Sequence, residues 1–263
     1  MAKPFVNPFV SGQFLELRVD ALVSDGRGLG RHDGVVVLVE DALPGQLVRA
    51  RVDAVRKSLA EAALVEVLKR SPDEQEPPCP HAGRCGGCSW QSLAYDRQLA
   101  WKERIVHDAL ERVGKVACPP MLPILPSPSE WGYRNKMEFA FGVSGDGGKA
   151  LGLRECGSRN IVEVTGCLLQ TPLTMRVLEA VRMLSNGAFH DLDGRFLVVR
   201  EPNAGGCFVE LIVGAGGSLE AGERFAEALR AETPEVTGFA LSERLAPSDV
   251  AYGERALYAD GRL

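Results

Sequence analysis

Three of the seven cysteines in this chain of 263 residues lie within a run of ten residues, at Cys79, Cys85 and Cys88. Five residues separate the first two and two separate the last two, where Gly86 and Gly87 allow the backbone to turn tightly. An odd number of cysteines in a chain without a secretion signal disfavours a disulfide framework. Clustered thiols of this kind predict a metal site, which ties the surrounding backbone to one point.

Two kinds of metal fit three thiolates at this spacing. Zinc requires a fourth ligand, for which His81 or a more distant cysteine is available. A 4Fe–4S cluster requires four thiolates, and Cys167 is a candidate for the fourth. The residues alone leave both alternatives open.

The segment before the cysteines has the pattern of a small all-β domain. Residues 1–12 contain two prolines and no periodic pattern, which indicates a tail. In residues 13–70 the runs 15–19, 35–39, 48–54 and 63–68 are strand-like, and residues 25–30 and 43–45 are predicted turns. Several short strands with tight turns predict a closed, OB-like β-barrel.

The rest of the chain predicts a different architecture. Residues 71–118 comprise a proline-rich linker, the cysteine run and a helix over 93–113 that ends at Gly114. Residues 119–263 mix strand patterns (137–143, 151–154, 161–164, 196–200 and 208–213) with helical ones (172–185 and 219–231). The predicted fold class is therefore a small β-barrel followed by an α+β domain.

Charge and hydropathy limit the class of protein. No apolar run reaches the roughly 18–20 residues that span a bilayer, and no signal core follows Met1, so we expect a cytoplasmic protein without a membrane partner. The formal net charge is −5. From residue 171 onward there are 9 basic and 14 acidic residues, which accounts for the whole excess. The neutral part before residue 171 is therefore compatible with a basic surface for RNA, and the acidic part after it disfavours one.

Four segments resemble one enzyme family. Residues 79–91 with the following 93–102 are similar to the cysteine run of the iron–sulfur RNA (uracil-5-)methyltransferases. Residues 28–46 resemble the TRAM domain that precedes this run in the family. Residues 131–139 resemble its Tyr-Arg-Asn-Lys strand, and 153–169 resemble the segment whose cysteine completes the cluster.

The resemblance implies a cofactor, a partner and a set of site residues. It implies a 4Fe–4S cluster on Cys79, Cys85, Cys88 and Cys167 in an iron–sulfur-bearing central domain, and favours 23S rRNA as the substrate of a monomeric enzyme in rRNA processing. It makes RNA contacts plausible for six basic residues, four of them on barrel turns: Arg27, Arg31, Arg56, Lys57, Arg134 and Lys136.

The same resemblance implies a catalytic domain that binds S-adenosylmethionine, with a nucleophilic cysteine and a carboxylate base. We expect this domain to be missing, because only Cys207 follows Cys167 and about 45 residues follow the glycine loop 214–217. On this view the chain is a truncated, inactive RNA-recognition portion with no catalytic residue. The alternatives are a stand-alone RNA-binding metal module (iron–sulfur or zinc) and a radical enzyme, which a fourth thiolate at Cys167 disfavours.

Overall fold

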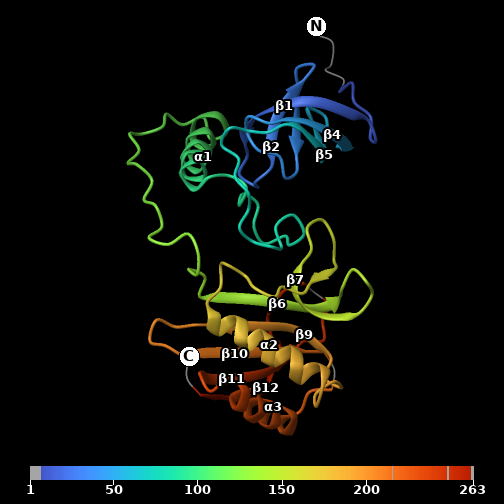
Figure 1. Ribbon diagram of the computed structural model, residues 1–263, viewed down its shortest axis with the longest axis vertical. Coiled ribbons are helices and arrows are strands. Elements are labelled where there is room, and N and C mark those ends of the chain that lie inside the picture. The colour runs from blue at the N-terminus through green and yellow to red at the C-terminus, as the bar shows by residue number, and fades with distance from the viewer. Residues whose placement is uncertain (1–6, 215, 248, 262–263) are drawn as a thin grey trace. The chain divides into compact units, whose positions relative to one another are not determined.

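The computed structural model describes residues 7–214, 216–247 and 249–261 (Figure 1). They form two compact units. The first contains the residues up to Ala82 together with Cys88–Ser127, and the second contains Gly83–Gly87 together with the residues from Pro128 onward. The short segment Gly83–Gly87 therefore belongs to the second unit although the chain on either side of it belongs to the first.

The first unit contains the predicted β-barrel, which is closed and has the order β1-β2-β3-β5-β4. Inward-facing residues alternate with exposed ones along β1, and the barrel interior is filled by valine, leucine and alanine, with Val19, Val37 and Val48 fully buried. All pairs are antiparallel except β3 with β5. The strands are β1 (Phe14–Leu22), β2 (Gly28–His32), β3 (Val35–Val39), β4 (Leu47–Val55) and β5 (Leu59–Lys69).

Strand β2 corrects the prediction that residues 25–30 form only a turn. Gly28 and Gly30 pair with β1 and β3 inside the barrel. A Cβ atom at Gly28 would lie 2.6 Å from the carbonyl oxygen of Ala42, and one at Gly30 would lie 2.3 Å from that of Arg18. These glycines are therefore required by close backbone approach within a strand.

The predicted helix is also present and packs within the same unit. It comprises α1 (Tyr95–Asp108) and the π-helical turn η1 (Ala109–Val113), after which the Gly114 N–H donates to the carbonyl of Ala109 at 2.8 Å. Trp101 and Ile105 are half-buried against a cluster formed by Leu22, Leu43 and Leu93. The Trp90 indole N–H donates to the carbonyl of Gly26 at 3.0 Å. This helix is thereby attached to the barrel.

The second unit is built on one seven-stranded sheet with the order β12-β11-β10-β9-β6-β7-β8. Only β10 and β11 pair in parallel, and they are joined through α3, whereas the remaining pairs within the sheet are antiparallel. The strands are β6 (Lys136–Val143), β7 (Lys149–Arg154), β8 (Ile161–Val162), β9 (Gly194–Arg200), β10 (Cys207–Val213), β11 (Val236–Glu243) and β12 (Arg255–Gly261). The predicted barrel followed by an α+β unit is confirmed.

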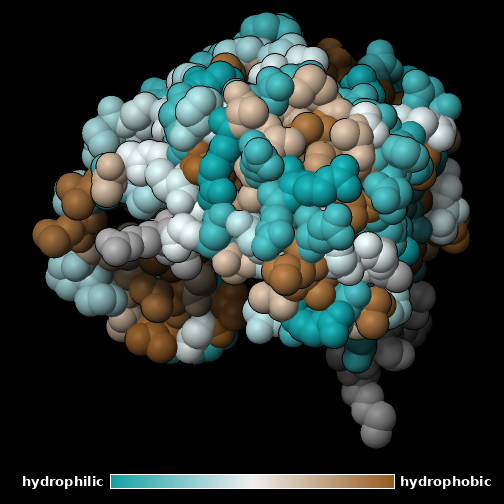
Figure 2. All heavy atoms as spheres, turned by 90° about the horizontal axis from the view of Figure 1, so that it is seen from below, coloured by the Kyte–Doolittle hydropathy of each residue, from teal (hydrophilic) through white to brown (hydrophobic). Residues whose placement is uncertain are grey.

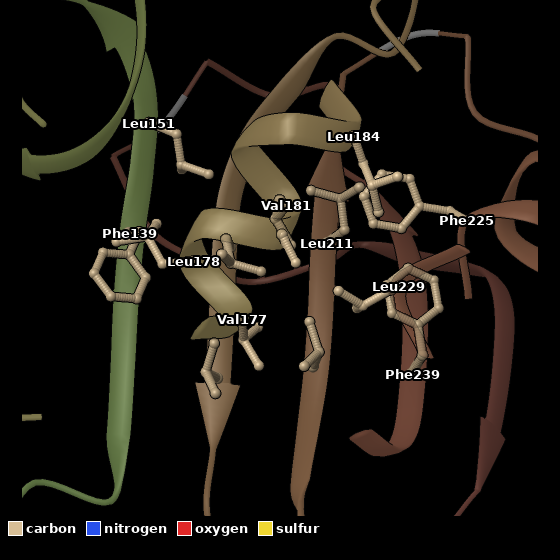
Figure 3. Close-up of a cluster of buried hydrophobic side chains, with 14 of the residues drawn as sticks. Phe139, Leu151, Val177, Leu178, Val181, Leu184, Leu211, Phe225, Leu229 and Phe239 are labelled. Atoms are coloured by element: carbon tan, nitrogen blue, oxygen red, sulfur yellow. The ribbon is translucent and has the colours of Figure 1, made fainter. Parts of the chain in front are cut away.

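One face of this sheet carries the main core, under α2 (Pro172–Asn186) and α3 (Leu219–Glu232). In Figure 3, Val177, Leu178 and Val181 of α2 lie over the strands that bear Phe139 and Leu211. Phe225 of α3 stacks on Phe239 with 5.5 Å between ring centroids. The strand period of two places Ala140, Phe196 and Ile212 on the opposite face, where they form a second cluster.

The surface is mixed in character. On the face shown in Figure 2, hydrophilic residues are interspersed with hydrophobic ones. Within the residues that the structure describes, no helix is long and apolar enough to cross a membrane.

Candidate functional site

The middle of the cysteine run is held against the second unit by backbone pairing. The Gly86 N–H donates to the carbonyl of Arg154 at 2.9 Å, and the Cys156 N–H donates to the carbonyl of Arg84 at 2.8 Å. Between these bonds Cys85 forms a β-bridge with Glu155 and packs on the edge of the main core. The run is thus ordered by main-chain bonds to the end of β7 rather than by its thiols alone.

The two glycines allow this close approach. A Cβ atom at Gly86 would lie 3.4 Å from the carbonyl oxygen of Arg154, and one at Gly87 would lie 3.4 Å from the Sγ atom of Cys85. Both distances are at the short end of ordinary van der Waals contact. A side chain at residue 87 would therefore lie in contact with the Cys85 sulfur.

The four predicted metal ligands are divided between the units. Cys79 and Cys88 belong to the first, and Cys85 and Cys167 belong to the second. All four are half-buried, and none of the seven cysteines, which all lie in the described ranges, forms a disulfide. Among the described residues no group of three or more cysteine, histidine, aspartate or glutamate side chains is arranged to hold a metal ion. The ligand set therefore stays a prediction.

Cys207 is unsuited to nucleophilic chemistry. It is fully buried in β10, next to the core under α2 and α3. Burial raises the pKa of its thiol to about 11, so the thiol is protonated at neutral pH. This residue is part of the core.

The basic residues predicted to contact RNA differ in how they are paired. On the barrel, Arg27 forms an ion pair with Asp25 at 2.7 Å and Arg56 forms one with Glu61 at 3.4 Å. The hydrogen bond from Arg27 holds the pKa of the Asp25 carboxyl below its usual value. Neither pair is deeply buried, so each is worth at most about 1 kcal/mol.

Of the six basic residues predicted to contact RNA, Arg31 and Lys57 are exposed and have no ion-pair partner in the described part of the chain. In the second unit, Lys136 pairs with Glu138 at 2.6 Å, and the Arg134 guanidinium lies 3.9 Å from the sulfur of Met137. Arg31 and Lys57 are therefore the barrel cations best able to meet a phosphate.

Side chains from other parts of the second unit lie close to the glycine loop after β10. A Cβ atom at Gly214 would lie 2.1 Å from the carboxylate of Asp193, and one at Gly217 would lie 2.5 Å from the side chain of Leu257. Ser218 caps α3 by accepting from the Ala221 N–H at 3.1 Å. These observations agree with the interpretation of this segment as a strand and turn.

The second unit contains a cavity that no feature of the sequence indicates. The cavity has a volume of about 710 Å³ and lies where β6 ends and β7 and β9 begin, beside the last turn of α2. Its lining comes from several separate stretches of chain between Phe141 and Asp249, and none of the predicted site residues is among them. Only the fold brings these residues together.

Comparison with known proteins identifies relatives for nearly the whole chain. Residues 8–65 match the TRAM domain. A protein of Nitratidesulfovibrio vulgaris described as an uncharacterized RNA methyltransferase is 44% identical over 97% of this chain and 57% of its own length. A second, from Synechocystis, is 30% identical over 95% of this chain and 56% of its own length. The chain thus spans little more than half the length of these relatives.

One solved structure is similar in fold over the same extent. It is the tRNA (uracil-54, C5)-methyltransferase of Pyrococcus abyssi in complex with S-adenosyl-L-homocysteine, with a TM-score of 0.65. The match covers 94% of this chain and 55% of that protein at 22% sequence identity.

These matches overturn one expectation. The prediction of a missing catalytic domain and an inactive, truncated chain is wrong, because nearly the whole chain aligns with methyltransferases, 97% of it in the Nitratidesulfovibrio relative and 94% in the Pyrococcus structure. The error came from judging a whole protein by where this sequence stops. With a TRAM domain at residues 8–65 and similarity over 97% of its length, the chain is a relative of the RNA methyltransferases.

Proposed function

We propose that this chain functions in a SAM-dependent RNA (uracil-5-)methyltransferase. It binds the RNA in which carbon 5 of a uridine receives the methyl group. The observation that carries the proposal is the 44% identity to an RNA methyltransferase over 97% of the chain. The similarity in fold to a tRNA uracil-C5 methyltransferase supports the same reaction class.

In this function the barrel has the task of holding the RNA backbone. Arg31 and Lys57 supply exposed charge, and Arg27 can exchange Asp25 for a phosphate at small cost because their ion pair is partly solvated. Carbon 5 of uracil becomes nucleophilic only after a thiolate adds at carbon 6, and S-adenosylmethionine supplies the methyl group when bound. Cys207 is excluded from that role by its burial and its protonated thiol.

We further propose 23S rRNA as the substrate, modified by a monomer in the cytoplasm. The resemblance of residues 79–91 to the iron–sulfur members of the family supports this choice. The Pyrococcus structure belongs to an enzyme named for tRNA, so tRNA is the second candidate.

A 4Fe–4S cluster on Cys79, Cys85, Cys88 and Cys167 is part of the proposal. The donor set suits it: the four half-buried cysteines form no disulfide, and Gly87, which has no side chain, lies beside the Cys85 sulfur. A cluster bound there would cross-link the cysteine run to Cys167, about 80 residues away in the chain. Zinc is the alternative metal. Anaerobic purification followed by iron, sulfide and zinc analysis tests it; stoichiometric zinc without sulfide would exclude the cluster.

The reaction is tested in cells and in vitro. Deleting the gene that encodes this chain is expected to remove one 5-methyluridine, mapped by mass spectrometry in 23S rRNA and in tRNA, and restoring the gene should return it. An unchanged 5-methyluridine content in both RNAs would refute the proposed reaction. Fluorescence anisotropy with a labelled uridine-rich RNA separately tests whether the purified chain binds RNA.

A further inference from the structure

The cavity in the second unit has a lining rich in positive charge. It is open to solvent, and its volume of about 710 Å³ lies within the range of pockets that hold small ligands, roughly 300–1,000 Å³. Five cationic side chains line it: Lys149, Arg154, Arg159, Arg182 and Arg195.

Two of these cations are fixed by neutral partners. The Arg182 side chain is only 11% exposed, and its Nε and Nη2 atoms donate to the carbonyl of Leu151 at 2.9 and 2.7 Å. It also forms a 3.4 Å ion pair with Glu179, whose side chain is 76% exposed. The Arg195 Nη1 atom donates to the carbonyl of Ala246 at 3.2 Å. Main-chain carbonyls orient these guanidinium groups without cancelling their charge.

Three carboxylates share the lining and neutralise part of this charge. Asp249 forms an ion pair with Arg154 at 2.9 Å, while Asp191 and Asp193 complete the acidic set. Lys149 and Arg159 are exposed, and within the described ranges their side chains have no ion-pair partner. Five cations against three carboxylates leave the lining positive.

This positive cavity stands out against its surroundings. From residue 171 onward the chain carries 9 basic and 14 acidic residues, yet Arg182 and Arg195 from that acidic part both turn toward the cavity. A cleft with an excess of positive charge attracts an anionic ligand.

The cavity also offers groups that suit a nucleobase. Phe141 is half-buried, and three atoms of its ring would lie 2.9 Å from a Cβ atom at Gly194, so the ring packs closely on the backbone there. Ser185 and Asn186 add a hydroxyl and an amide to the lining. Aromatic rings beside arginine and lysine are the usual surroundings of a splayed-out RNA nucleotide.

We propose that this cavity is a second RNA site, separate from the barrel, which holds a nucleotide of the bound RNA with its phosphate on Lys149 and Arg159. The inference rests on the proposed function, since it assigns a further part of the same RNA. Its proposed phosphate contacts come from the part of the chain before residue 171, and Arg182 and Arg195 add positive charge from the acidic part that follows.

The test compares two double variants of equal charge. K149Q/R159Q removes the two unpaired cations of the cavity. R176Q/R255Q is the matched control, because Arg176 and Arg255 are exposed, lie outside the cavity and form ion pairs with Glu235 and Glu243. Anisotropy of a labelled single-stranded uridine-rich RNA is measured from low to high salt for the wild-type chain and both variants, with thermal unfolding as the check on folding.

The cavity variant is expected to lose about tenfold in RNA affinity, and its slope of log K against log salt should become shallower by about 0.7, the value for one neutralised phosphate of a single strand. The control should lose much less. Wild-type affinity and slope in K149Q/R159Q, or an equal loss in R176Q/R255Q, would overturn the cavity site while leaving RNA binding intact. A wild-type chain that binds no RNA would overturn RNA binding itself and the cavity site with it.

Inorganic phosphate at matched ionic strength distinguishes an RNA site from a general anion site. Phosphate is expected to leave RNA affinity unchanged, because a nucleotide also contacts the aromatic and amide groups of the lining. Displacement of RNA from the wild-type chain but not from K149Q/R159Q would show a site for free phosphate and refute the nucleotide assignment.

Discussion

Gly30 in β2 lies directly against the main chain of Arg18 in β1, so that a Cβ atom added at Gly30 would stand 2.3 Å from the Arg18 carbonyl oxygen. Backbone cannot yield as a flexible side chain can. The closure of the barrel between these two strands therefore depends on the absence of a side chain at this position.

We expect Gly30→Ala to destabilise the first unit by about 2–3 kcal/mol, in the upper part of the range of about 1–3 kcal/mol found for overpacked interiors. Gly34→Ala is the control, because its surroundings are open and only its positive φ of 79° opposes a side chain, at about 1 kcal/mol. Urea unfolding followed by the fluorescence of Trp90 and Trp101 measures both. Equal losses in the two variants would contradict the close-approach argument.

Asp260 should make the second unit sensitive to acid. Its hydrogen bonds with Arg230, and further ones from Tyr258 and the Phe239 N–H, lower the pKa of its carboxyl from 3.8 to about 2. A lowered folded-state pKa stabilises the fold above pH 3.8 and loses that contribution as pH falls toward 2. Because the pair is partly solvated, we expect it to contribute about 1 kcal/mol at pH 7.

The stability difference between wild type and Asp260→Asn should therefore shrink as pH falls from about 4 to 2. Glu223→Gln, on an exposed position of α3, should show no such convergence. The free energy of unfolding measured at several pH values decides between them. A difference that is constant over this range would argue against a stabilising ion pair.

Phe225 holds α3 on the sheet through its stack with Phe239 and its edge contact with Phe189, whose centroid is 4.8 Å away. Because it is fully buried, Phe225→Ala should cost about 3–5 kcal/mol. Leu219→Ala, at a side chain that is 60% exposed on the same helix, should change stability by less than about 0.5 kcal/mol. Calorimetric unfolding of the two variants compares them directly; a small loss at Phe225 would mean that α3 contributes little to the core.

The proposed cluster predicts unequal effects of two cysteine substitutions. Cys167→Ser should abolish iron and sulfide binding, because it removes one of four proposed thiolate ligands. Cys118→Ser removes an equally half-buried thiol that has no proposed role and should leave metal content unchanged. Iron content and visible absorption after anaerobic purification are the readouts. Full metal content in Cys167→Ser would remove this residue from the ligand set.

Basic residues of the barrel that lack an ion pair should contribute more to RNA affinity than those that form one. R31Q/K57Q removes two cations that have no ion-pair partner among the described residues, whereas R27Q/R56Q removes two that are already paired with Asp25 and Glu61. With the same change in net charge, the first variant should weaken RNA binding more, by several-fold, and lower its salt dependence more. Identical titrations of the two variants would show that pairing does not decide RNA contact.

The parts of the fold that could be predicted are those with regular burial. Alternation along residues 15–19 and 48–54 predicts strands of the barrel because one side of each strand faces its interior. The helix of 172–185 is equally visible, since Val177, Leu178 and Val181 form one buried face. Such patterns are local and need no knowledge of neighbours.

What could not be predicted depends on distant neighbours. Gly28 and Gly30 look like turn residues until the backbone of Ala42 and Arg18 is placed beside them. β11 and β12 are absent from the predicted strands, and β11 is the parallel partner of β10, a pairing that depends on α3. The cavity escapes notice because its lining is spread from Phe141 to Asp249 and no local motif marks it.

The path of the chain between the units has a practical consequence for dividing the protein. The segment Gly83–Gly87 belongs to the second unit, so the chain passes between the units three times, after Ala82, after Gly87 and after Ser127. A fragment that begins at Pro128 would lose the backbone bonds that Arg84 and Gly86 make to Cys156 and Arg154, and would expose that edge of its sheet. A single cut after Ser127 therefore does not yield either unit as one complete fragment. After limited proteolysis at this point, we expect the two fragments to stay associated through residues 83–87.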